Sequence, residues 1–530
     1  MSDQPRDKNS ADGKVRSEKQ QARKERFLAQ KHGKGTEQRR EADPQKKRQP
    51  GRARDHREKE RNPAGERNFY TKRSDVEPVK SGARLARGAE RVDLPMGRLL
   101  FHVLAVLEEA TNSDSPIDRA LAAHFSNIKG RLTPRDHTRI RDMVWGVVRR
   151  YRRLLWWLEV NGQTPQVRKL LLADLVLTHG KNVQDITHFC KGGGGYLKRL
   201  TDSEARALSA MDGKRLADET MPEAVTLECP AWAEKGLREV FGDRFAEEVD
   251  ALREPAPLDI RVNPFKGNRD DLIPRLEKAG CKVEKLDWLP YGLRITDAGR
   301  KAHLPFYERG EFEIQDAGSQ VLATMVAVEP GQRVIDFCAG AGGKTLALAA
   351  EMDNRGQLIA ADVHNKRLAR AAQRLKRAGV FNAERKVLES ERDPWVKKNK
   401  GKFDRVLVDA PCSGTGSWRR APDSKWRRDE TDLEELVTLQ ESILTSAARL
   451  VKPGGRLVYA TCSLLPVENE DQIARFLRSR PDFKLVPVKD VWDTKMPSPM
   501  PETMGDMLRL SPATNDTDGF FAAILERSMD

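Results

Sequence analysis

The chain has 530 residues, of which 38% are hydrophobic, and its 95 Lys and Arg exceed its 80 Asp and Glu by +15. No run of 18 apolar residues occurs, which excludes a membrane-spanning helix, and the start MSDQPRDKNS lacks the apolar stretch of a secretory signal. The six cysteines form no Cys-x-x-Cys pair, so the sequence indicates neither a metal site nor a disulfide framework. We therefore expect a cytoplasmic protein in a reducing compartment, without membrane contact.

The first 92 residues are strongly basic and lack aliphatic periodicity. Residues 1–90 contain 26 Lys and Arg but 15 Asp and Glu. Such a segment buries too little apolar surface to offset its chain entropy, so we predict that residues 1–92 form a disordered tail. Because neutralised phosphates release counterions, the tail favours a nucleic-acid partner over a purely solubilising role.

Residues 93–215 show the spacing of amphipathic helices. LLFHVLAVLEEA is one, and TPRDHTRIRDMVWGVVRRYRRLLWWLEV predicts a single long helix capped by Thr133, with Pro134 at its first position. Four arginines cluster near its middle and fit either phosphate contacts or a solvated face: Arg149, Arg150, Arg152 and Arg153. The glycine run 192–195 indicates a flexible break rather than a phosphate loop, because no Lys-Ser/Thr follows it.

The remaining chain predicts two further domains. In residues 222–327, PLDIRVNPF and YGLRIT are typical of strands and DDLIPRLEKAG of a helix, which indicates a small α+β domain. In residues 328–530, strands and helices alternate. This order predicts an α/β, Rossmann-like domain with a mostly parallel sheet covered by helices on both faces.

The glycine-rich stretch DFCAGAGGKT lies between a predicted strand and helix. A triphosphate loop would need glycine where Cys338 stands, and a dinucleotide fingerprint would need it at Thr345, so both are excluded. What remains is a tight turn with Gly340, Gly342 and Gly343 that lets a ligand approach the backbone. Asp362, at the end of the next strand, is suited to bind both ribose hydroxyls. The pattern predicts a nucleoside ligand without a pyrophosphate, for which S-adenosylmethionine is the common choice.

Two cysteines follow apolar, strand-like runs. Cys412 comes after RVLVDAP and Cys462 after GRLVYAT, each flanked by small polar residues. Ligands of open α/β sheets bind beyond the carboxyl ends of the strands, so both thiols should share one crevice with the glycine-rich turn. We prefer a functional role for them over that of buried structural cysteines.

This combination suits methylation of a pyrimidine at carbon 5. A thiolate that adds to carbon 6 makes carbon 5 nucleophilic towards a sulfonium methyl group, and a second group then assists elimination. Asp409 is suited to hydrogen-bond or protonate the ring edge. Methylation of an exocyclic amine would favour Asp/Asn-Pro-Pro-aromatic, and DNA cytosine methylation Pro-Cys-Gln, but the chain has Asp409-Ala-Pro-Cys412.

With these motifs the sequence resembles the RsmB/Nop/Sun family of RNA cytosine-5 methyltransferases. The resemblance rests on DFCAGAGGKT, DAPCSGTGSWRR and YATCSLLPVENE, with IRVNPFK, GEFEIQDAGSQ and TDGFF in support. The family's class I methyltransferase fold would cover roughly Pro222 to the C-terminus. More weakly, the helical segment resembles the NusB-like RNA-binding domain of the bacterial ribosomal-RNA branch.

The resemblance implies a role for each motif. Cys462 would be the nucleophile and Cys412 would assist release, with Asp409 and Lys344 at the reacting centre. Contacts to S-adenosylmethionine would come from Cys338, Ala339, Gly340, Ala341, Gly342, Gly343, Lys344, Asp362 and Asp409. Glu389 or Ser390 stands where the family has a further acid, which leaves the adenine contact open.

The resemblance also implies an RNA substrate, ribosomal RNA in the first place, and we expect a monomer. SWRRAPDSKWRR, after Cys412, supplies cations and two tryptophans for phosphate and base contacts, so we predict that RNA enters there. The same chemistry on tRNA stays open. A non-catalytic RNA-binding assembly factor is the alternative, against which the retained Asp362, Asp409 and both cysteines argue.

Overall fold

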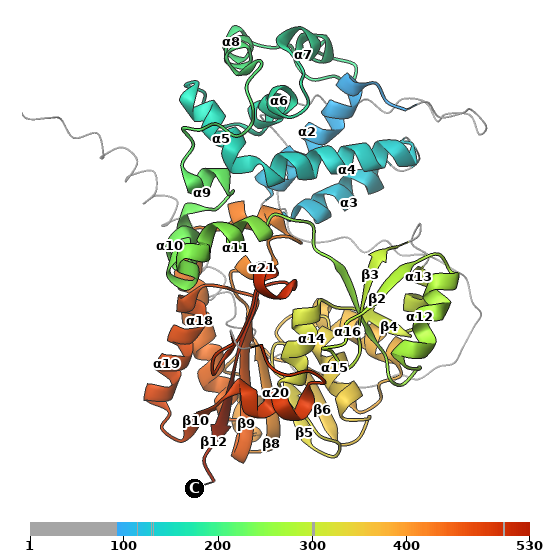
Figure 1. Cartoon of the computed structure of the whole chain (residues 1–530), viewed down its shortest axis with the longest axis vertical. Coiled ribbons are helices and arrows are strands. Elements are labelled where there is room, and N and C mark those ends of the chain that lie inside the picture. Colours follow the sequence, from blue (N-terminus) through green and yellow to red (C-terminus); the bar gives the residue numbers. More distant parts are fainter. Residues whose placement is uncertain are drawn as a thin grey trace, which may run out of the picture. The chain divides into compact units, whose positions relative to one another are not determined.

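The computed structural model describes residues 93–529, except for residues 114, 129, 131, 299–302 and 502–503. The segment 1–92, predicted to be a disordered tail, lies outside the described residues. In the described part, no helix is both long and apolar enough to cross a lipid bilayer. Figure 1 shows the described elements, which comprise a group of helices, a small sheet and a larger mixed sheet.

The region predicted to be helical contains short helices around one apolar core. The core runs from Leu99 in the first helix to Val225. Thr133 caps its helix as predicted, in a reciprocal capping box with Asp136, and Pro134 is the first helical residue. The helices are α2 (Met96–Asn112), α3 (Ile117–Asn127), α4 (Pro134–Arg149), α5 (Tyr151–Val160), α6 (Val167–Leu177), α7 (Val183–Phe189) and α8 (Asp202–Met211).

The long helix predicted from residue 134 onward is broken at Arg150, so this prediction is wrong in one respect. Arg150 leaves the helical conformation, with φ −110° and ψ 13°, and α5 begins at the next residue. The buried carboxylate of Glu228 accepts hydrogen bonds from the backbone N–H groups of Arg152 and Arg153, at 2.8 and 3.2 Å. These N–H groups lack partners within α5, so a remote acid caps the second helix.

A helical segment then leads into a small antiparallel sheet. The segment contains α9 (Glu223–Thr226), α10 (Ala231–Phe241), a 3-10 turn (Gly242–Arg244) and α11 (Phe245–Ala251). Its apolar side chains pack on Trp418, Leu464 and Leu465 of the C-terminal region rather than on the small sheet. The small sheet has the order β2-β3-β1-β4. Its elements are β1 (Leu258–Val262), α12 (Arg269–Lys278), β2 (Lys282–Lys285), β3 (Gly292–Asp297), α13 (Leu304–Glu308) and β4 (Phe312–Ile314).

The C-terminal region folds into the predicted Rossmann-like sheet. Its strands follow the order β10-β12-β9-β8-β5-β6-β7, and β11 pairs with β12. All neighbours from β9 to β7 are parallel, whereas β12 is antiparallel to both β9 and β10. The strands are β5 (Arg333–Asp336), β6 (Gln357–Asp362), β7 (Ala383–Val387), β8 (Phe403–Asp409), β9 (Val451–Thr461), β10 (Phe483–Val486), β11 (Leu508–Leu510) and β12 (Phe520–Arg527).

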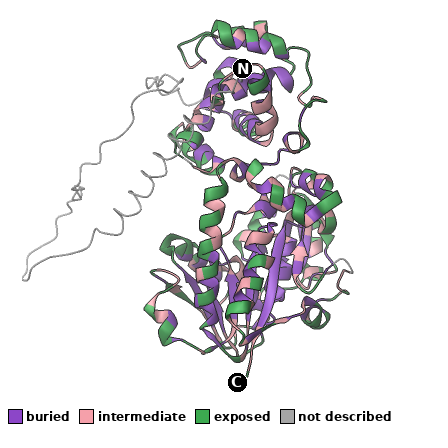
Figure 2. Ribbon diagram, turned by 90° about the vertical axis from the view of Figure 1, so that its left-hand side faces the viewer, coloured by how far each residue is buried: buried purple, intermediate pink, exposed green. Residues whose placement is uncertain are grey.

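Helices cover both faces of this sheet, as the sequence predicts. Alternate residues of one strand enter different cores, for example Val334 and Ile335 of β5. One core holds side chains of α14, α15 and α20, and the other those of α18 and α19. Figure 2 shows the strands as the most continuously buried part of the ribbon. The helices are α14 (Ala317–Thr324), α15 (Gly343–Glu351), α16 (Asn365–Ala378), α17 (Pro394–Lys398), α18 (Glu430–Ala448), α19 (Glu470–Ser479), α20 (Val488–Lys495) and α21 (Pro512–Asn515).

Candidate active site

Chemically reactive side chains gather at the carboxyl edge of the parallel strands. Asp336 ends β5, Asp362 ends β6 and Asp409 ends β8. The loops after β8 and β9 carry Cys412 and Cys462. Because parallel strands end on the same edge, these side chains lie near one another. The sequence predicts this for Asp362, Asp409 and the two cysteines; Asp336 is not among the predicted residues, and a shared functional site stays a prediction.

The two thiols are in direct contact. Their sulfur atoms are 3.4 Å apart, within hydrogen-bonding distance for sulfur, and both cysteines are half-buried. A hydrogen bond from the Cys412 thiol lowers the pKa of Cys462; burial opposes this shift and the Lys344 ammonium supports it. The same hydrogen bond and burial raise the pKa of Cys412. The pair therefore favours a thiolate at Cys462 and a protonated thiol at Cys412.

A lysine and an aspartate lie beside the thiols. The Lys344 ammonium donates to the Asp409 carboxylate at 2.7 Å, and its nitrogen lies 5.7 Å from the centre of the Phe520 ring. Burial alone would lower the pKa of Lys344, but the Asp409 charge and hydrogen bond outweigh it, so the pKa is raised. Lys344 is therefore a fixed cation at this site. The Asp409 side chain is 31% exposed and remains accessible to a ligand.

The glycine-rich turn after β5 fits the nucleoside of a methyl donor. Gly340 and Gly342 have positive φ angles of 55° and 81°. A Cβ at Gly342 would lie 2.9 Å from that of Ala371, whereas one at Gly340 would have no neighbour closer than 4.0 Å. The turn therefore needs glycine at 342 for packing and leaves the backbone at 340 open to a ligand.

Asp362 holds this turn and keeps acceptor capacity. One carboxylate oxygen accepts from the Gly340 N–H at 2.8 Å and the other from the His364 N–H at 2.7 Å. A carboxylate oxygen has two acceptor positions, so each oxygen retains one that suits a ribose hydroxyl. The residues present thus fit the nucleoside part of S-adenosylmethionine.

The other predicted cofactor residues lie in the same turn. Ala339 donates its N–H to the Ala361 carbonyl, and the Ala341 carbonyl accepts from Arg374. Gly343 and Lys344 begin α15. Burial raises the pKa of Cys338 well above its ordinary value, so its thiol stays protonated. Each of these residues lies where the sequence predicts, and their contacts to a cofactor stay a prediction.

The two residues proposed for the adenine side lie after β7. Glu389 is exposed, and its backbone N–H donates to the Asp393 carboxylate at 2.9 Å. Ser390 is half-buried, and its hydroxyl oxygen accepts from the Arg392 N–H. Neither contact distinguishes the two candidates, so the choice stays open.

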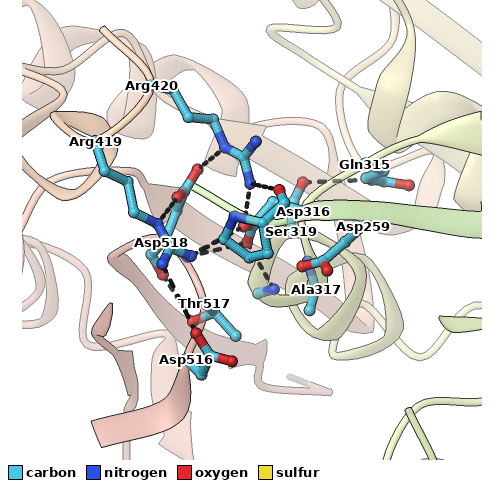
Figure 3. A network of polar contacts seen from close by, with 12 residues as sticks. Asp259, Gln315, Asp316, Ala317, Ser319, Arg419, Arg420, Asp516, Thr517 and Asp518 are labelled. Atoms are coloured by element: carbon cyan, nitrogen blue, oxygen red, sulfur yellow. Dashed lines mark hydrogen bonds and ion pairs between the residues drawn. The ribbon is translucent and has the colours of Figure 1, made fainter. Parts of the chain in front are cut away.

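The loop predicted to bind RNA is partly buried, so that prediction is wrong for its buried residues Trp418, Arg419 and Lys425. Arg419 is 4% exposed and bonds to the Asp518 carboxylate at 2.5 Å. Arg420 bonds to Asp518 and, at 2.8 Å, to Asp316. Figure 3 shows both guanidinium groups turned towards these acids. The two arginines join the loop after β8, the start of α14 and the segment before β12.

Three further residues of this loop also make contacts within the protein. Trp418 is fully buried, and Lys425 is 3% exposed with its ammonium on the Glu228 carbonyl. Trp426 donates to the Val148 carbonyl and packs on Tyr151 with 5.0 Å between ring centres. These contacts join the C-terminal region to the helices, and burial removes Trp418 and Lys425 from any contact with a base. The sequence shows the cations but not their buried partners.

Three of the four arginines clustered around the junction of α4 and α5 also have acidic partners within the protein. Arg150 forms two hydrogen bonds to the buried Asp174, and Arg153 bonds to the buried Glu228. Arg152 pairs with Glu159 at 3.3 Å. These three arginines have intramolecular partners, which argues against a dedicated phosphate site there.

A buried acid that the sequence did not predict as part of the site lies beside the residues that follow the two thiols. Glu468 is fully buried and binds Ser413 and Ser463, the residues that follow Cys412 and Cys462. The available signal was the repetition of Cys-Ser in both motifs, followed by an acid shortly after the second.

Comparisons with known proteins identify the family. The model of the family described as 16S rRNA methyltransferase RsmB/F matches residues 323–526, and that of its ferredoxin-like domain matches residues 229–300. A probable ribosomal RNA small subunit methyltransferase B of Synechocystis is 32% identical over 441 residues, which cover 78% of this chain and 95% of the relative. The chain belongs to the RsmB/F methyltransferase family. S-adenosylmethionine is the methyl donor that fits its glycine-rich turn.

A second curated relative and a solved structure are also similar to this chain. The ribosomal RNA small subunit methyltransferase B of Escherichia coli O6:K15:H31 is 30% identical over 75% of this chain and 92% of its own length. The crystal structure of PH0851 superposes with a TM-score of 0.65 at 26% identity, covering 82% of this chain and all of that protein. The predicted fold class, a Rossmann-like methyltransferase sheet preceded by an α+β domain, is confirmed. The domain limits 93–215, 222–327 and 328–530 stay a prediction.

Proposed function

We propose that this protein methylates carbon 5 of a cytosine in ribosomal RNA through a transient covalent bond to Cys462. The observation that carries the proposal is the pair of thiols 3.4 Å apart beside the Lys344–Asp409 ion pair. A single thiolate would be enough for a reaction that needs only nucleophilic attack. A second thiol in contact with it suits a reaction in which a covalent adduct must form and later be released.

In this proposal Cys462 attacks carbon 6 of the pyrimidine, and the Lys344–Asp409 ion pair stabilises the negative charge that develops on the ring. The Cys462 thiolate forms a bond to carbon 6, and the ring electrons move towards the N3 edge, where the Lys344 ammonium, held by the Asp409 carboxylate, donates to the developing negative charge. The bond between carbons 5 and 6 is thereby polarised so that carbon 5 becomes nucleophilic. Bound S-adenosylmethionine supplies an electrophilic methyl group. The lowered pKa of Cys462 supports its role as the attacking group.

Release requires removal of a proton from carbon 5. The proton on carbon 5 leaves to a base, its bonding electrons restore the double bond between carbons 5 and 6, and the carbon–sulfur bond breaks to regenerate the Cys462 thiolate. Cys412 touches the departing sulfur and is the group we propose to assist this elimination. Its raised pKa keeps it protonated during attack, so that it does not compete as nucleophile.

Two observations support RNA as the substrate. The similar proteins of Synechocystis and Escherichia coli are named ribosomal RNA small subunit methyltransferases. In addition, the four-glycine loop borders a cavity of about 390 Å³ that Lys191, Lys198 and Arg199 line. Such a basic cavity is suited to phosphates of the RNA backbone. We further propose a cytoplasmic location, since all six cysteines are free thiols, and a monomeric state.

The two cysteine variants test this function. With S-adenosylmethionine and small-subunit ribosomal RNA, Cys462→Ala should transfer no methyl group. Cys412→Ala should accumulate a protein–RNA adduct that survives denaturing electrophoresis, because attack proceeds and release stalls. Full activity of Cys462→Ala, together with no adduct from Cys412→Ala, would overturn the proposal. RNA binding without donor binding, measured by calorimetry, would support the alternative of a non-catalytic assembly factor.

A further inference from the structure

The loops that carry the two cysteines are joined through one buried carboxylate. Glu468 accepts hydrogen bonds from the Ser413 N–H at 2.8 Å and from the Gln440 side-chain amide at 2.9 Å, both on one oxygen. Its other oxygen accepts from the hydroxyl groups of Ser413 and Ser463. Those hydroxyl oxygens are themselves 3.2 Å apart. The carboxylate therefore lies between the residues that directly follow Cys412 and Cys462.

Burial makes this arrangement rigid. Glu468, Ser463 and Gln440 have no exposed surface, and Ser413 is 2% exposed. A buried carboxylate without partners is strongly unfavourable, so its four hydrogen bonds must be kept together in the folded state. Any displacement of either serine breaks such bonds. Because neighbouring Cα atoms are separated by about 3.8 Å, the adjoining cysteine moves with its serine.

The negative charge itself does not promote the reaction. The Glu468 carboxylate acts to raise the pKa of both Cys412 and Cys462, which opposes formation of a thiolate. We therefore attribute the role of Glu468 to the positions of its two oxygen atoms and not to its charge. It accepts hydrogen bonds from two loops at once, which a serine or an apolar side chain cannot do.

We propose that Glu468 is a positioning residue that sets the contact between the Cys412 and Cys462 thiols. The inference rests on the proposed function for its meaning, but the contact itself can be tested without RNA or methyl donor. Other bonds also join the loops, since the Gly416 N–H donates to the Cys462 carbonyl and the Leu464 N–H to the Thr415 hydroxyl. Loss of Glu468 therefore shifts the cysteines and does not release the loops altogether.

Two substitutions separate geometry from charge. In Glu468→Gln, the amide oxygen can face the Ser413 N–H and Gln440, while the amide nitrogen donates to the two serine hydroxyls, which also accept hydrogen bonds. This variant keeps the link and loses the charge. Glu468→Ala loses both. If Glu468→Ala does not fold, Ser463→Ala removes one hydroxyl from the link at a smaller cost.

The measurement is the rate at which diamide converts the two thiols of the full-length protein into a disulfide. Diamide takes up the two electrons and two protons and becomes the hydrazine, and peptide mapping identifies the Cys412–Cys462 bond. Glu468→Gln should oxidise at least as fast as the wild type, because it keeps the link between the loops and removes a charge that opposes thiolate formation. Glu468→Ala, or Ser463→Ala in its place, should be slower by about tenfold to a hundredfold, as expected for a misplacement of about 1 Å.

Controls distinguish this role from general destabilisation. Glu204 is a buried acid of α8 that binds Arg168 and Thr201 far along the chain from the cysteines, so Glu204→Ala should leave the oxidation rate unchanged. In methyl transfer, Glu468→Ala should lose kcat with little change in KM for RNA, and Glu468→Gln should retain most of the kcat. Wild-type oxidation of Glu468→Ala, or equal impairment of Glu468→Gln, would overturn the inference. Failure of the proposed function alone would leave the oxidation result intact.

Discussion

Replacing Arg419 with methionine decides whether the loop after Cys412 belongs to the fold or to an RNA surface. Arg419 is 4% exposed, and its partner Asp518 is 3% exposed. A second acid, Asp316, lies 3.6 Å from the same guanidinium. Methionine keeps much of the apolar stem but removes the charge. Arg419→Met therefore leaves two buried carboxylates with Arg420 as their cationic partner in this network (Figure 3).

The burial of the Arg419 ion pair determines how much unfolding free energy Arg419→Met should lose. Removing one partner of a buried ion pair costs about 3–5 kcal/mol, because the other charge stays buried. An exposed pair one helical turn apart contributes at most about 0.5 kcal/mol. Lys489 and Asp493 of α20 form such a pair, with side chains 63% and 49% exposed. Arg419→Met should therefore lower the free energy of unfolding by several kcal/mol, and Lys489→Met should scarcely change it.

Urea denaturation followed by tryptophan fluorescence measures the unfolding free energy, and an RNA-binding titration at several salt concentrations measures phosphate contacts. Arg419→Met should shift the denaturation midpoint and keep the wild-type salt dependence while folded. A wild-type midpoint with weaker RNA binding, and a salt slope reduced by about one, would refute the reasoning and restore the loop as an RNA contact.

Three further variants test other parts of the structure. A Cβ at Gly416 would lie 2.2 Å from the Gly519 carbonyl oxygen, so Gly416→Ala should lose about 1–3 kcal/mol of unfolding free energy, measured in urea; an unchanged midpoint would contradict the packing. Burial raises the pKa of Asp336 from 3.8 to about 7, so the wild type loses up to about 4 kcal/mol of stability as the pH rises from 4 to 7. Asp336→Asn should therefore gain Tm relative to the wild type between pH 5 and pH 8, and a constant difference would argue against the shift. Replacing Lys191 and Lys198 with glutamate should weaken RNA binding and reduce its salt slope by about one to two at an unchanged Tm; equal binding would exclude that cavity as an RNA contact.

The fold and the thiol pair could be predicted because they follow from local patterns and one topological rule. Apolar runs of strand length, separated by helical spacing, indicate a parallel sheet. Once the sheet is accepted, the ends of β8 and β9 must lie on one edge, which brings Cys412 and Cys462 together. No side-chain contact had to be known in advance.

The features that the sequence did not predict depend on partner residues that are distant in the chain. The break at Arg150 needs Glu228, and the burial of Arg419 needs Asp316 and Asp518, which lie about a hundred residues away on either side. A sequence pattern shows that a residue is charged, but whether that charge meets solvent, phosphate or a buried acid is decided by tertiary packing. Glu468 was missed for the same reason, since it acts on two loops that the sheet brings together.

The reversed direction of β12 explains why the end of the chain contributes to the site. An antiparallel strand begins on the edge where its parallel neighbours end, so the segment before β12 meets the loops after β8 and β9. There the Gly519 N–H donates to the Gly416 carbonyl at 2.8 Å, Asp518 binds the two arginines, and Phe520 faces Lys344. The loop that follows Cys412 is consequently held between Glu468 on one side and the β12 segment on the other. The buried cations Arg419 and Lys425 therefore hold this loop in the fold, whereas Arg427 of the same loop remains exposed.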